Sequence, residues 1–274
     1  MGIPYAEVIG DPIAHSKSPL IHKFWLEKLG IEGDYRATRV APGGLRDYFR
    51  DRTADPDWRG CNISMPHKLA ARAHAFHRQD PSFPPWPINL AYRDPDRRLI
   101  GEEFDSAGFL KSVLKLRGEH SGPSSALVLG AGSTARLVAW GLAHFGCMPI
   151  WIWNRDEEKA RAFAKDFARI GVQVLAPGTE APTVDILVNA TPLGMAGMPE
   201  VEIDLTPLPD HALICDLVYD PTETALLKQA RARGLRAVNG LHMLVEQAAP
   251  SFHRLFGAMP PRALDGELWE ALEA

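Results

Sequence analysis

Apolar runs and amphipathic segments alternate along the chain, and their spacing predicts where strands and helices lie. Short apolar runs bounded by glycine, proline or aspartate are typical of strands, whereas apolar positions at helical spacing indicate helices. In the first part of the chain, strands are predicted over residues 5–9, 35–40, 60–64, 89–93 and 98–102. Helices are predicted over residues 19–29, 44–50, 67–76 and 106–116. The last two strands are expected to form a hairpin across Asp94, Pro95 and Asp96.

Residues 120–125 have the composition of a linker, and a second alternating series begins after them. In this series, strands are predicted over residues 126–129, 149–153, 186–189, 212–216 and 236–239. Helices are predicted over residues 134–145, 157–170 and 224–233, followed by two more over residues 241–256 and 264–272. Because strands that alternate with helices are typical of parallel sheets, the sequence predicts an α/β protein with two domains.

A glycine-rich turn between a predicted strand and a predicted helix points to a dinucleotide. The turn has a GxGxxA pattern and consists of Gly130, Ala131, Gly132, Ser133, Thr134 and Ala135. The first glycine permits a tight turn, the second lets the backbone approach a pyrophosphate, and the alanine allows close packing of helix and strand. The helix N-terminus offers N–H groups and a partial positive charge to the phosphates. We therefore predict a dinucleotide site, and the alternative is a tight turn without a ligand.

The end of the next predicted strand bears on which dinucleotide binds. NAD enzymes usually place an acid there for the ribose hydroxyls, whereas basic side chains accommodate the 2′-phosphate of NADP. Asn154, Arg155 and Lys159 occupy this stretch, and the two cations could hold that phosphate. Residues 156–158 are all acidic, which argues for NAD unless these acids only favour the first turn of a helix. We favour NADP, and NAD remains the alternative.

Composition and charge limit the classes of partner. Of the 274 residues, 46% are hydrophobic and 23% are charged, and the net charge of −4 gives no reason to expect nucleic acid or an anionic membrane as a partner. No apolar run approaches the ~20 residues that a membrane helix needs, and no signal peptide is recognisable. The 3 cysteines lie far apart and the 10 histidines lack metal-ligand spacing, so neither a disulfide framework nor a metal is expected. These features fit a cytoplasmic monomer or homodimer.

A lysine and an aspartate are candidates for proton transfer. Lys68 follows the predicted strand 60–64, and Asp105 precedes the predicted helix 106–116. Burial and charged neighbours can bring the pKa of a lysine towards neutrality, which suits acid–base catalysis. By spacing alone, ordinary structural roles fit both residues: Lys68 as a surface residue at a helix N-terminus, and Asp105 as an N-cap.

Short segments spread over most of the chain carry a resemblance to a known family. They are residues 9–19, 62–68, 130–132, 154–155, 189–195, 216–219 and 239–249. In this order they resemble the shikimate dehydrogenase family, which includes quinate/shikimate dehydrogenases. The resemblance implies an α/β substrate-binding and catalytic domain of residues 1–105 and 241–274, to which the final helices return. It also implies a Rossmann NADP-binding domain of residues 106–240.

The resemblance assigns roles by position. Lys68 and Asp105 would be the acid–base pair at the hydroxyl that is oxidised. Ser16 and Ser18 would bind the substrate carboxylate, and the other residues that would contact the substrate are Ser64, Asn89, Tyr219 and Gln247. The residues that would bind the cofactor are Gly130, Ala131, Gly132, Ser133, Thr134, Asn154, Arg155, Lys159, Thr191, Leu217, Gly240 and Asp80. The implied reaction is the reversible NADP-dependent reduction of 3-dehydroshikimate, or of a related cyclic carboxylate ketone, to shikimate.

The resemblance weakens around Asn89 and Asp105. Where the family usually has threonines beside these residues, this chain has Leu90 and Phe104, and Glu103 replaces an asparagine. A pocket that exchanges hydroxyls for apolar side chains should favour a less hydroxylated ring. Alternatively, Leu90 and Phe104 point into the core and the substrate is unchanged.

Three other functions are alternatives to this one. One is a quinate/shikimate enzyme that uses NAD, and another is a non-catalytic regulatory protein that binds a dinucleotide on the same scaffold. The third, a folate-type dehydrogenase, does not suit the serines of residues 16–19 or the segments around Tyr219 and Gln247.

Overall fold

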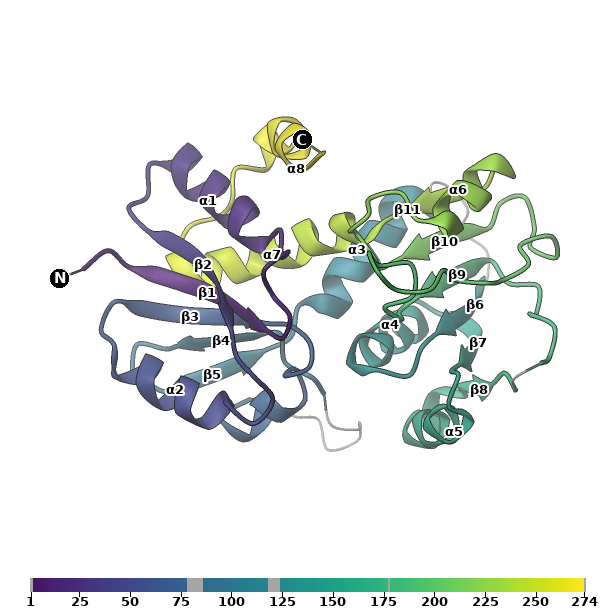
Figure 1. Cartoon of the computed structure of the whole chain (residues 1–274), viewed down its shortest axis with the longest axis horizontal. Coiled ribbons are helices and arrows are strands. Elements are labelled where there is room, and N and C mark those ends of the chain that lie inside the picture. Colours follow the sequence, from purple (N-terminus) through teal and green to yellow (C-terminus); the bar gives the residue numbers. More distant parts are fainter. Residues whose placement is uncertain (1, 78–85, 118–123, 177, 274) are drawn as a thin grey trace. The chain divides into compact units, whose positions relative to one another are not determined.

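The computed structural model describes residues 2–77, 86–117, 124–176 and 178–273, without the side chains of residues 114–117. These residues form two compact units. The first unit comprises residues 2–77, 86–104 and 247–273, and the second comprises the described residues from 105 to 246. Each unit holds one sheet with helices packed against it, so the predicted α/β class is confirmed (Figure 1). Asp80 and most of the predicted linker, residues 120–123, lie outside the described residues.

The sheet of the first unit has the strand order β2-β1-β3-β4-β5. Its strands are β1 (Tyr5–Gly10), β2 (Asp34–Arg39), β3 (Trp58–Ile63), β4 (Leu90–Arg93) and β5 (Leu99–Glu102). β1 pairs in parallel with β2 and β3, whereas β4 is antiparallel to both β3 and β5. The predicted hairpin is therefore confirmed, and it makes this sheet mixed rather than wholly parallel.

Helices cover both faces of this first sheet (Figure 1). They are α1 (Ser18–Leu29), α2 (Leu45–Ala54), α8 (Asp265–Glu273) and the part of α7 (Gly240–Phe256) from Gln247 onward. α8 lies against α1, where Lys28 and Glu267 form an ion pair of 2.5 Å. The C-terminal helices thus return to the first unit, as predicted. None of the helices in the described residues combines the length and the apolar character needed to cross a membrane.

The helix predicted over residues 67–76 is wrong in type and extent. Only residues Ala70–Ala73 are helical, as a short 3-10 segment. The carbonyl of Lys68 accepts a hydrogen bond from the N–H of Ile88 at 3.0 Å, so it does not serve a helical turn. The backbone of Phe76 pairs with β5, because its N–H donates to Leu99 and its carbonyl accepts from Gly101, both at 2.8 Å. Contacts between distant segments therefore override the local apolar spacing.

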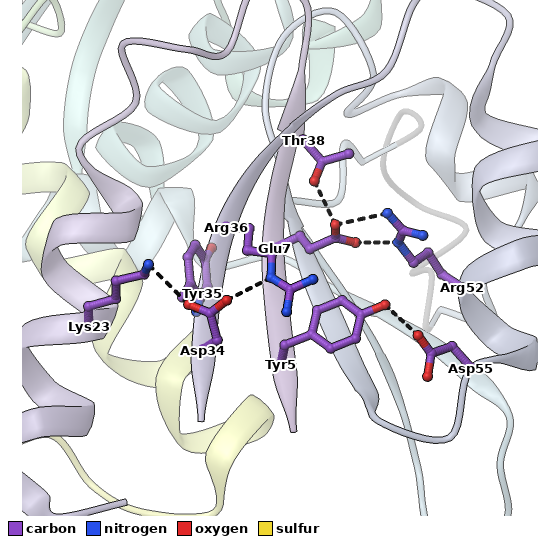
Figure 2. A network of polar contacts seen from close by, with 9 residues as sticks. All are labelled: Tyr5, Glu7, Lys23, Asp34, Tyr35, Arg36, Thr38, Arg52 and Asp55. Carbon is purple, nitrogen blue, oxygen red and sulfur yellow. Dashed lines mark hydrogen bonds and ion pairs between the residues drawn. The ribbon is translucent and has the colours of Figure 1, made fainter. Parts of the chain in front are cut away.

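A buried carboxylate lies on the face of the first sheet that α2 covers. Glu7 on β1 is 1% exposed and accepts hydrogen bonds from Thr38 (2.6 Å), Tyr48 (2.8 Å) and Arg52 Nε (2.7 Å). Figure 2 shows the carboxylate between Thr38 and Arg52. Because a buried charge is costly unless it is paired and hydrogen-bonded, these donors are needed to keep Glu7 in the core.

A buried histidine, His22 on α1, lies over the opposite face of the sheet. The ring of His22 stacks on Tyr35 with the two ring centroids 4.0 Å apart. No described residue hydrogen-bonds to its Nδ1, and burial lowers the pKa of His22 to about 3. The neutral form is therefore the one that the fold accommodates.

We expect His22 to make the protein less stable as the pH falls below 6.5. The pKa of this imidazole is near 6.5 when unfolded and about 3 when folded, so between these values the unfolded state binds more protons and stability falls with pH. From pH 7 to pH 5 the loss is about 2 kcal/mol. His22→Phe keeps the stack on Tyr35 and does not titrate, so denaturant unfolding at the two pH values should show a smaller loss. An equal loss in the two proteins would contradict this assignment.

The sheet of the second unit has the order β11-β10-β9-β6-β7-β8, with every neighbouring pair parallel. Its strands are β6 (Ser124–Leu129), β7 (Cys147–Trp153), β8 (Gln173–Val174), β9 (Ile186–Asn189), β10 (Leu213–Asp216) and β11 (Arg236–Val238). Numbered from β6, this is the order 3-2-1-4-5-6 of the Rossmann fold. Its helices include α3 (Asp105–Arg117), α4 (Ser133–His144), α5 (Glu157–Asp166) and α6 (Ala225–Ala232).

Three details of the second unit differ from the prediction. Ser124 and Ser125 belong to β6 rather than to a linker, because the N–H and hydroxyl of Ser125 both donate to Asp185. The helix predicted over residues 157–170 ends at Asp166 and is followed by a 3-10 turn over Ala168–Ile170. β8 was not predicted, since its two residues are too short to show a period.

Candidate functional site

In the first unit, the loops that follow β1 and β3 are held together at the carboxyl edge of the sheet. Ile9 is in register with Ile63, and the N–H of Asp11 donates to the carbonyl of Met65 at 3.0 Å. A Cβ on Gly10 would lie 2.9 Å from that carbonyl oxygen, so this approach requires glycine. The serine run after β1 and the segment with Ser64 and Lys68 therefore lie on one edge.

Ser16 and Ser18 lie at the start of α1. The hydroxyl oxygen of Ser16 accepts the N–H of Ser18, the first residue of the helix, at 3.3 Å. This contact fits the structural reading of Ser16 as part of a helix start. The N-cap residue is Lys17, and a hydroxyl that accepts one hydrogen bond keeps its own O–H as a donor, so the contact with Ser18 and anion binding are compatible.

Asn89 and Gln247 meet at the same edge. The Asn89 Nδ2 donates to Gln247 Oε1 at 2.8 Å, while Asn89 Oδ1 accepts the N–H of Phe104 at 2.8 Å. The carbonyl of Asn89 accepts the N–H of Ile63, the residue before Ser64. The first unit thus brings together four of the predicted site residues from distant parts of the chain: Ser64, Lys68, Asn89 and Gln247.

The two predicted acid–base residues are both buried. Lys68 is 8% exposed in the turn after β3, so it is not the surface residue that spacing alone would allow. Asp105 is 0% exposed and is the first residue of α3 in the second unit. Lysine and aspartate are mostly exposed in proteins, so burial distinguishes both positions from an ordinary helix start at the surface. Tyr219 lies in the loop after β10, also in the second unit.

The glycine turn of the second unit has the shape that a dinucleotide needs. Gly130 has a φ of +105°, and a Cβ on it would lie 3.0 Å from the Ala190 carbonyl and from Thr191. At Gly132, by contrast, no described atom lies within 4 Å of an added Cβ. The space beside Gly132 and the N-terminus of α4 is therefore open to a phosphate, and Ala135 is fully buried against the sheet as predicted.

The acids after β7 serve helix α5. Asp156 is its N-cap, with Oδ1 accepting the N–H of Lys159 at 3.3 Å and Oδ2 3.5 Å from the Lys159 ammonium. Glu157 pairs with Arg161 at 2.5 Å. Arg155 is exposed, and no described residue forms a hydrogen bond or ion pair with it. The structure therefore leaves Arg155 available for a phosphate and supports the capping interpretation of the acids.

Three further predicted cofactor residues lie at the carboxyl edge of the second sheet. Thr191 follows β9, and Gly130 beside it follows β6. The two residues therefore flank the point where the strand order reverses. Gly240 lies against Leu217, because a Cβ on Gly240 would collide with the Leu217 carbonyl. Dinucleotides bind at such reversal points in parallel α/β sheets, so the position of these residues fits a cofactor. No group of three metal-ligating side chains occurs among the described residues.

Comparison with known proteins covers both units. One family model, "Shikimate dehydrogenase substrate binding domain", matches residues 8–80, and another, "Shikimate / quinate 5-dehydrogenase", matches residues 114–194. The shikimate dehydrogenase (NADP(+)) of Sphingopyxis alaskensis is 47% identical over 271 residues, which cover 99% of this chain and 97% of that protein. The chain belongs to the shikimate dehydrogenase family.

Other members agree in sequence and in fold. The shikimate dehydrogenase (NADP(+)) of Methylobacterium radiotolerans is 42% identical over 263 residues, covering 94% of this chain and 93% of that protein. The structure of shikimate 5-dehydrogenase from Thermus thermophilus, in complex with NADP(H) and shikimate, has a TM-score of 0.83 and 31% identity. The match covers 98% of this chain and 100% of that structure.

Two of the three departures from the usual pattern of the shikimate dehydrogenase family, Leu90 and Phe104, belong to or pack against the core. Leu90 is 0% exposed and belongs to an apolar cluster with Val8, Tyr35 and Leu255. Phe104 packs against the same cluster. Its backbone N–H, not its side chain, holds Asn89. These positions therefore favour the core interpretation over an altered substrate.

The sequence analysis missed two residues, Asp216 and Asn189, that hold the predicted cofactor residue Thr191 in place. Asp216, at the end of β10, is 0% exposed and accepts hydrogen bonds from Thr224 (2.6 Å), Asn189 (2.8 Å) and the N–H of Val218 (3.1 Å). Asn189 in turn accepts both the N–H and the hydroxyl of Thr191. Burial raises the pKa of Asp216. An acid at the end of a fully buried strand was the signal that could have identified it.

Proposed function

We propose that this protein is an NADP-dependent shikimate dehydrogenase that interconverts 3-dehydroshikimate and shikimate. The observation that carries the proposal is the polar edge of the first unit, where Ser64, Asn89 and Gln247 lie with Lys68 while the unusual Leu90 side chain is buried. An unaltered set of hydroxyl and amide groups suits a hydroxylated ring that carries a carboxylate. The names of the relatives support the same substrate and cofactor.

The substrate residues divide by the groups they would hold. We assign the carboxylate to the hydroxyls of Ser16 and Ser18, near the N-terminus of α1, where the helix dipole favours an anion. The residues assigned to the ring hydroxyls are Ser64, Asn89, Tyr219 and Gln247. Amides and hydroxyls suit this task because each can donate as well as accept a hydrogen bond.

Lys68 and Asp105 are assigned to the proton. In the oxidation direction, the neutral amine of Lys68 accepts the proton of the reacting hydroxyl, and in reduction the ammonium returns it. Asp105 is assigned to orienting the Lys68 amine at that hydroxyl, whose single proton is the one that Lys68 accepts. A positioned base of this kind contributes to the rate without any change in the redox chemistry.

The second unit provides the residues assigned to NADP, whose nicotinamide would accept or donate the hydride. The pyrophosphate is assigned to the turn of Gly130, Ala131, Gly132, Ser133 and Thr134. The 2′-phosphate is assigned to Asn154, Arg155 and Lys159, and the nicotinamide to Thr191, Leu217 and Gly240. Asp80, outside the described residues, is a further proposed contact near the nicotinamide.

Steady-state turnover tests the proposal. Nicotinamide absorbance would be followed with NADP⁺ or NAD⁺, each offered with shikimate and with quinate. We expect saturable turnover of shikimate with NADP⁺ and a much lower kcat/KM with the other three combinations. A higher kcat/KM for quinate with NAD⁺ would favour the quinate/shikimate alternative, and no turnover with any pair would favour the regulatory one.

Replacing Arg155 tests the assignment of NADP. Because a hydrogen bond to a charged group is worth about 1.5–3 kcal/mol, Arg155→Ala should raise the KM for NADP⁺ about 10- to 100-fold. The KM for NAD⁺ should change little, since NAD lacks the 2′-phosphate. Arg161→Ala is the matched control, because Arg161 lies on α5 and pairs with Glu157. Equal changes in the KM values for NADP⁺ and NAD⁺ would overturn this role of Arg155.

We also propose that the enzyme works in the cytoplasm as a monomer or homodimer. Cys61, Cys147 and Cys215 are all buried free thiols. Such thiols fit a reducing compartment, and size-exclusion chromatography with light scattering would determine the oligomeric state.

A further inference from the structure

Beside the proposed substrate residues, hydrogen bonds join four polar residues of the first unit into a closed ring. Asn62 Nδ2 donates to Ser251 Oγ at 2.9 Å, and Ser251 Oγ donates to the backbone carbonyl of Gln247 at 3.1 Å. Gln247 Oε1 accepts from Asn89 Nδ2 at 2.8 Å, and the backbone carbonyl of Asn89 accepts from Asn62 Nδ2 at 3.3 Å. The ring joins the end of β3, the start of β4 and helix α7, which are far apart in sequence.

Two donors outside the ring determine which way its amides face. The hydroxyl of Tyr35 donates to Asn62 Oδ1 at 2.7 Å, so the Asn62 nitrogen must face Ser251 and the Asn89 carbonyl. The N–H of Phe104 donates to Asn89 Oδ1 at 2.8 Å, so the Asn89 nitrogen must face Gln247. A carbonyl can only accept, and an N–H can only donate, so neither amide can turn over without losing a hydrogen bond.

The ring lies in a protein interior where such losses matter. Tyr35 and Ser251 are both 0% exposed, and the ring of His22 stacks on Tyr35. Hydrogen bonds in a low-dielectric interior reinforce one another, whereas an unsatisfied buried group is costly. The Asn62 amide is therefore tied to the backbone of Asn89 directly and to the backbone of Gln247 through Ser251.

We propose that Tyr35, Asn62 and Ser251 are positioning residues for substrate binding, which act by holding the backbone carbonyls of the two residues whose amides face the substrate, Asn89 and Gln247. This inference rests on the proposed function, because it assigns to the ring the task of presenting two amides to the substrate. Loss of the Tyr35 hydroxyl leaves Asn62 free to turn over and to release the ring. Binding of the ground state and of the transition state should then weaken together, which raises KM and leaves kcat nearly unchanged.

The test compares two buried tyrosines on opposite faces of one sheet. Tyr35→Phe should raise the KM for shikimate about tenfold, with kcat and the KM for NADP⁺ within about twofold of the wild type. Tyr48→Phe is the matched control, because the Tyr48 hydroxyl donates to Glu7 and has no contact with the ring. Tyr48→Phe should lower the stability of the fold without changing the KM for shikimate. Equal KM values in the two variants would overturn the inference.

A double-mutant cycle distinguishes a shared network from two separate structural effects. Ser251→Ala should also raise the KM for shikimate, and combining it with Tyr35→Phe should raise KM by clearly less than the product of the single effects. If the increase in KM of the double variant equalled the product of the two single increases, the two residues would act independently, and the proposed network would be wrong. Failure of the proposed function is a different outcome, because the wild-type enzyme would then show no turnover of shikimate.

Discussion

Replacing Lys68 by methionine should lower kcat for shikimate oxidation by about 10²- to 10⁴-fold, the range that a positioned acid or base contributes. Methionine matches the length and most of the volume of the lysine stem, and it cannot accept a proton. The change therefore removes the base while preserving the packing of a side chain that is 8% exposed. Stopped-flow or steady-state absorbance of the nicotinamide would measure the loss.

Two measurements separate this chemical effect from damage to the fold. NADP⁺ binding, followed by titration calorimetry, should be retained in Lys68→Met, because the described residues assigned to the cofactor lie in the other unit. Lys23→Met is the control lysine, since Lys23 is exposed on α1 and pairs only at the surface with Asp34. If Lys68→Met kept more than about a tenth of the wild-type kcat, Lys68 would not be the base.

The sequence was most informative where function depends on a short contiguous segment. The turn of Gly130 and Gly132 was predicted with its strand and helix, because close backbone approach requires glycine whatever surrounds it. Strands β6, β7, β9 and β10 were predicted nearly to their ends, since buried parallel strands are apolar throughout. In such segments the local pattern and the tertiary environment demand the same residues.

Prediction failed where partners from distant segments decide the structure. The helix expected over residues 67–76 was replaced by a turn because Ile88 and β5 take its backbone groups. The sequence does not show which way the Leu90 side chain points. The alternation of residues along β4 shows which side chains share a face, but not which face packs against the core. The contacts of Asn62 with Tyr35 and Ser251 span 27 and 189 residues, and no local sequence pattern predicts them.

The acids after β7 show how the same residues fit two functions until their partners are known. An acid at the end of the second Rossmann strand is a signal for NAD. Here Asp156 caps α5 and Glu157 pairs with Arg161, so both carboxylates are engaged by the helix that follows. The cofactor preference therefore depends on Arg155, whose side chain is exposed.

Removing the carboxylate of Glu7 should produce the largest loss of stability among the substitutions considered. Glu7→Leu leaves the Arg52 guanidinium without its partner and the hydroxyls of Thr38 and Tyr48 without their acceptor. Breaking a buried ion pair by removing one partner costs about 3–5 kcal/mol. The Arg52 side chain is 31% exposed and can recover some hydration, so we expect a loss of about 3 kcal/mol.

The measurement is guanidinium unfolding of the protein, followed by circular dichroism, with Asp51→Ala as the matched control. Asp51 precedes Arg52 on α2 and forms an exposed ion pair with Arg50, so its removal should cost less than about 1 kcal/mol. Glu7 lies on the face of the sheet opposite the Tyr35 network, so the folded Glu7→Leu enzyme should keep the wild-type KM for shikimate. Stability within about 1 kcal/mol of the wild type would show that Arg52, Thr38 and Tyr48 find other partners, and a raised KM would show that the two faces are coupled.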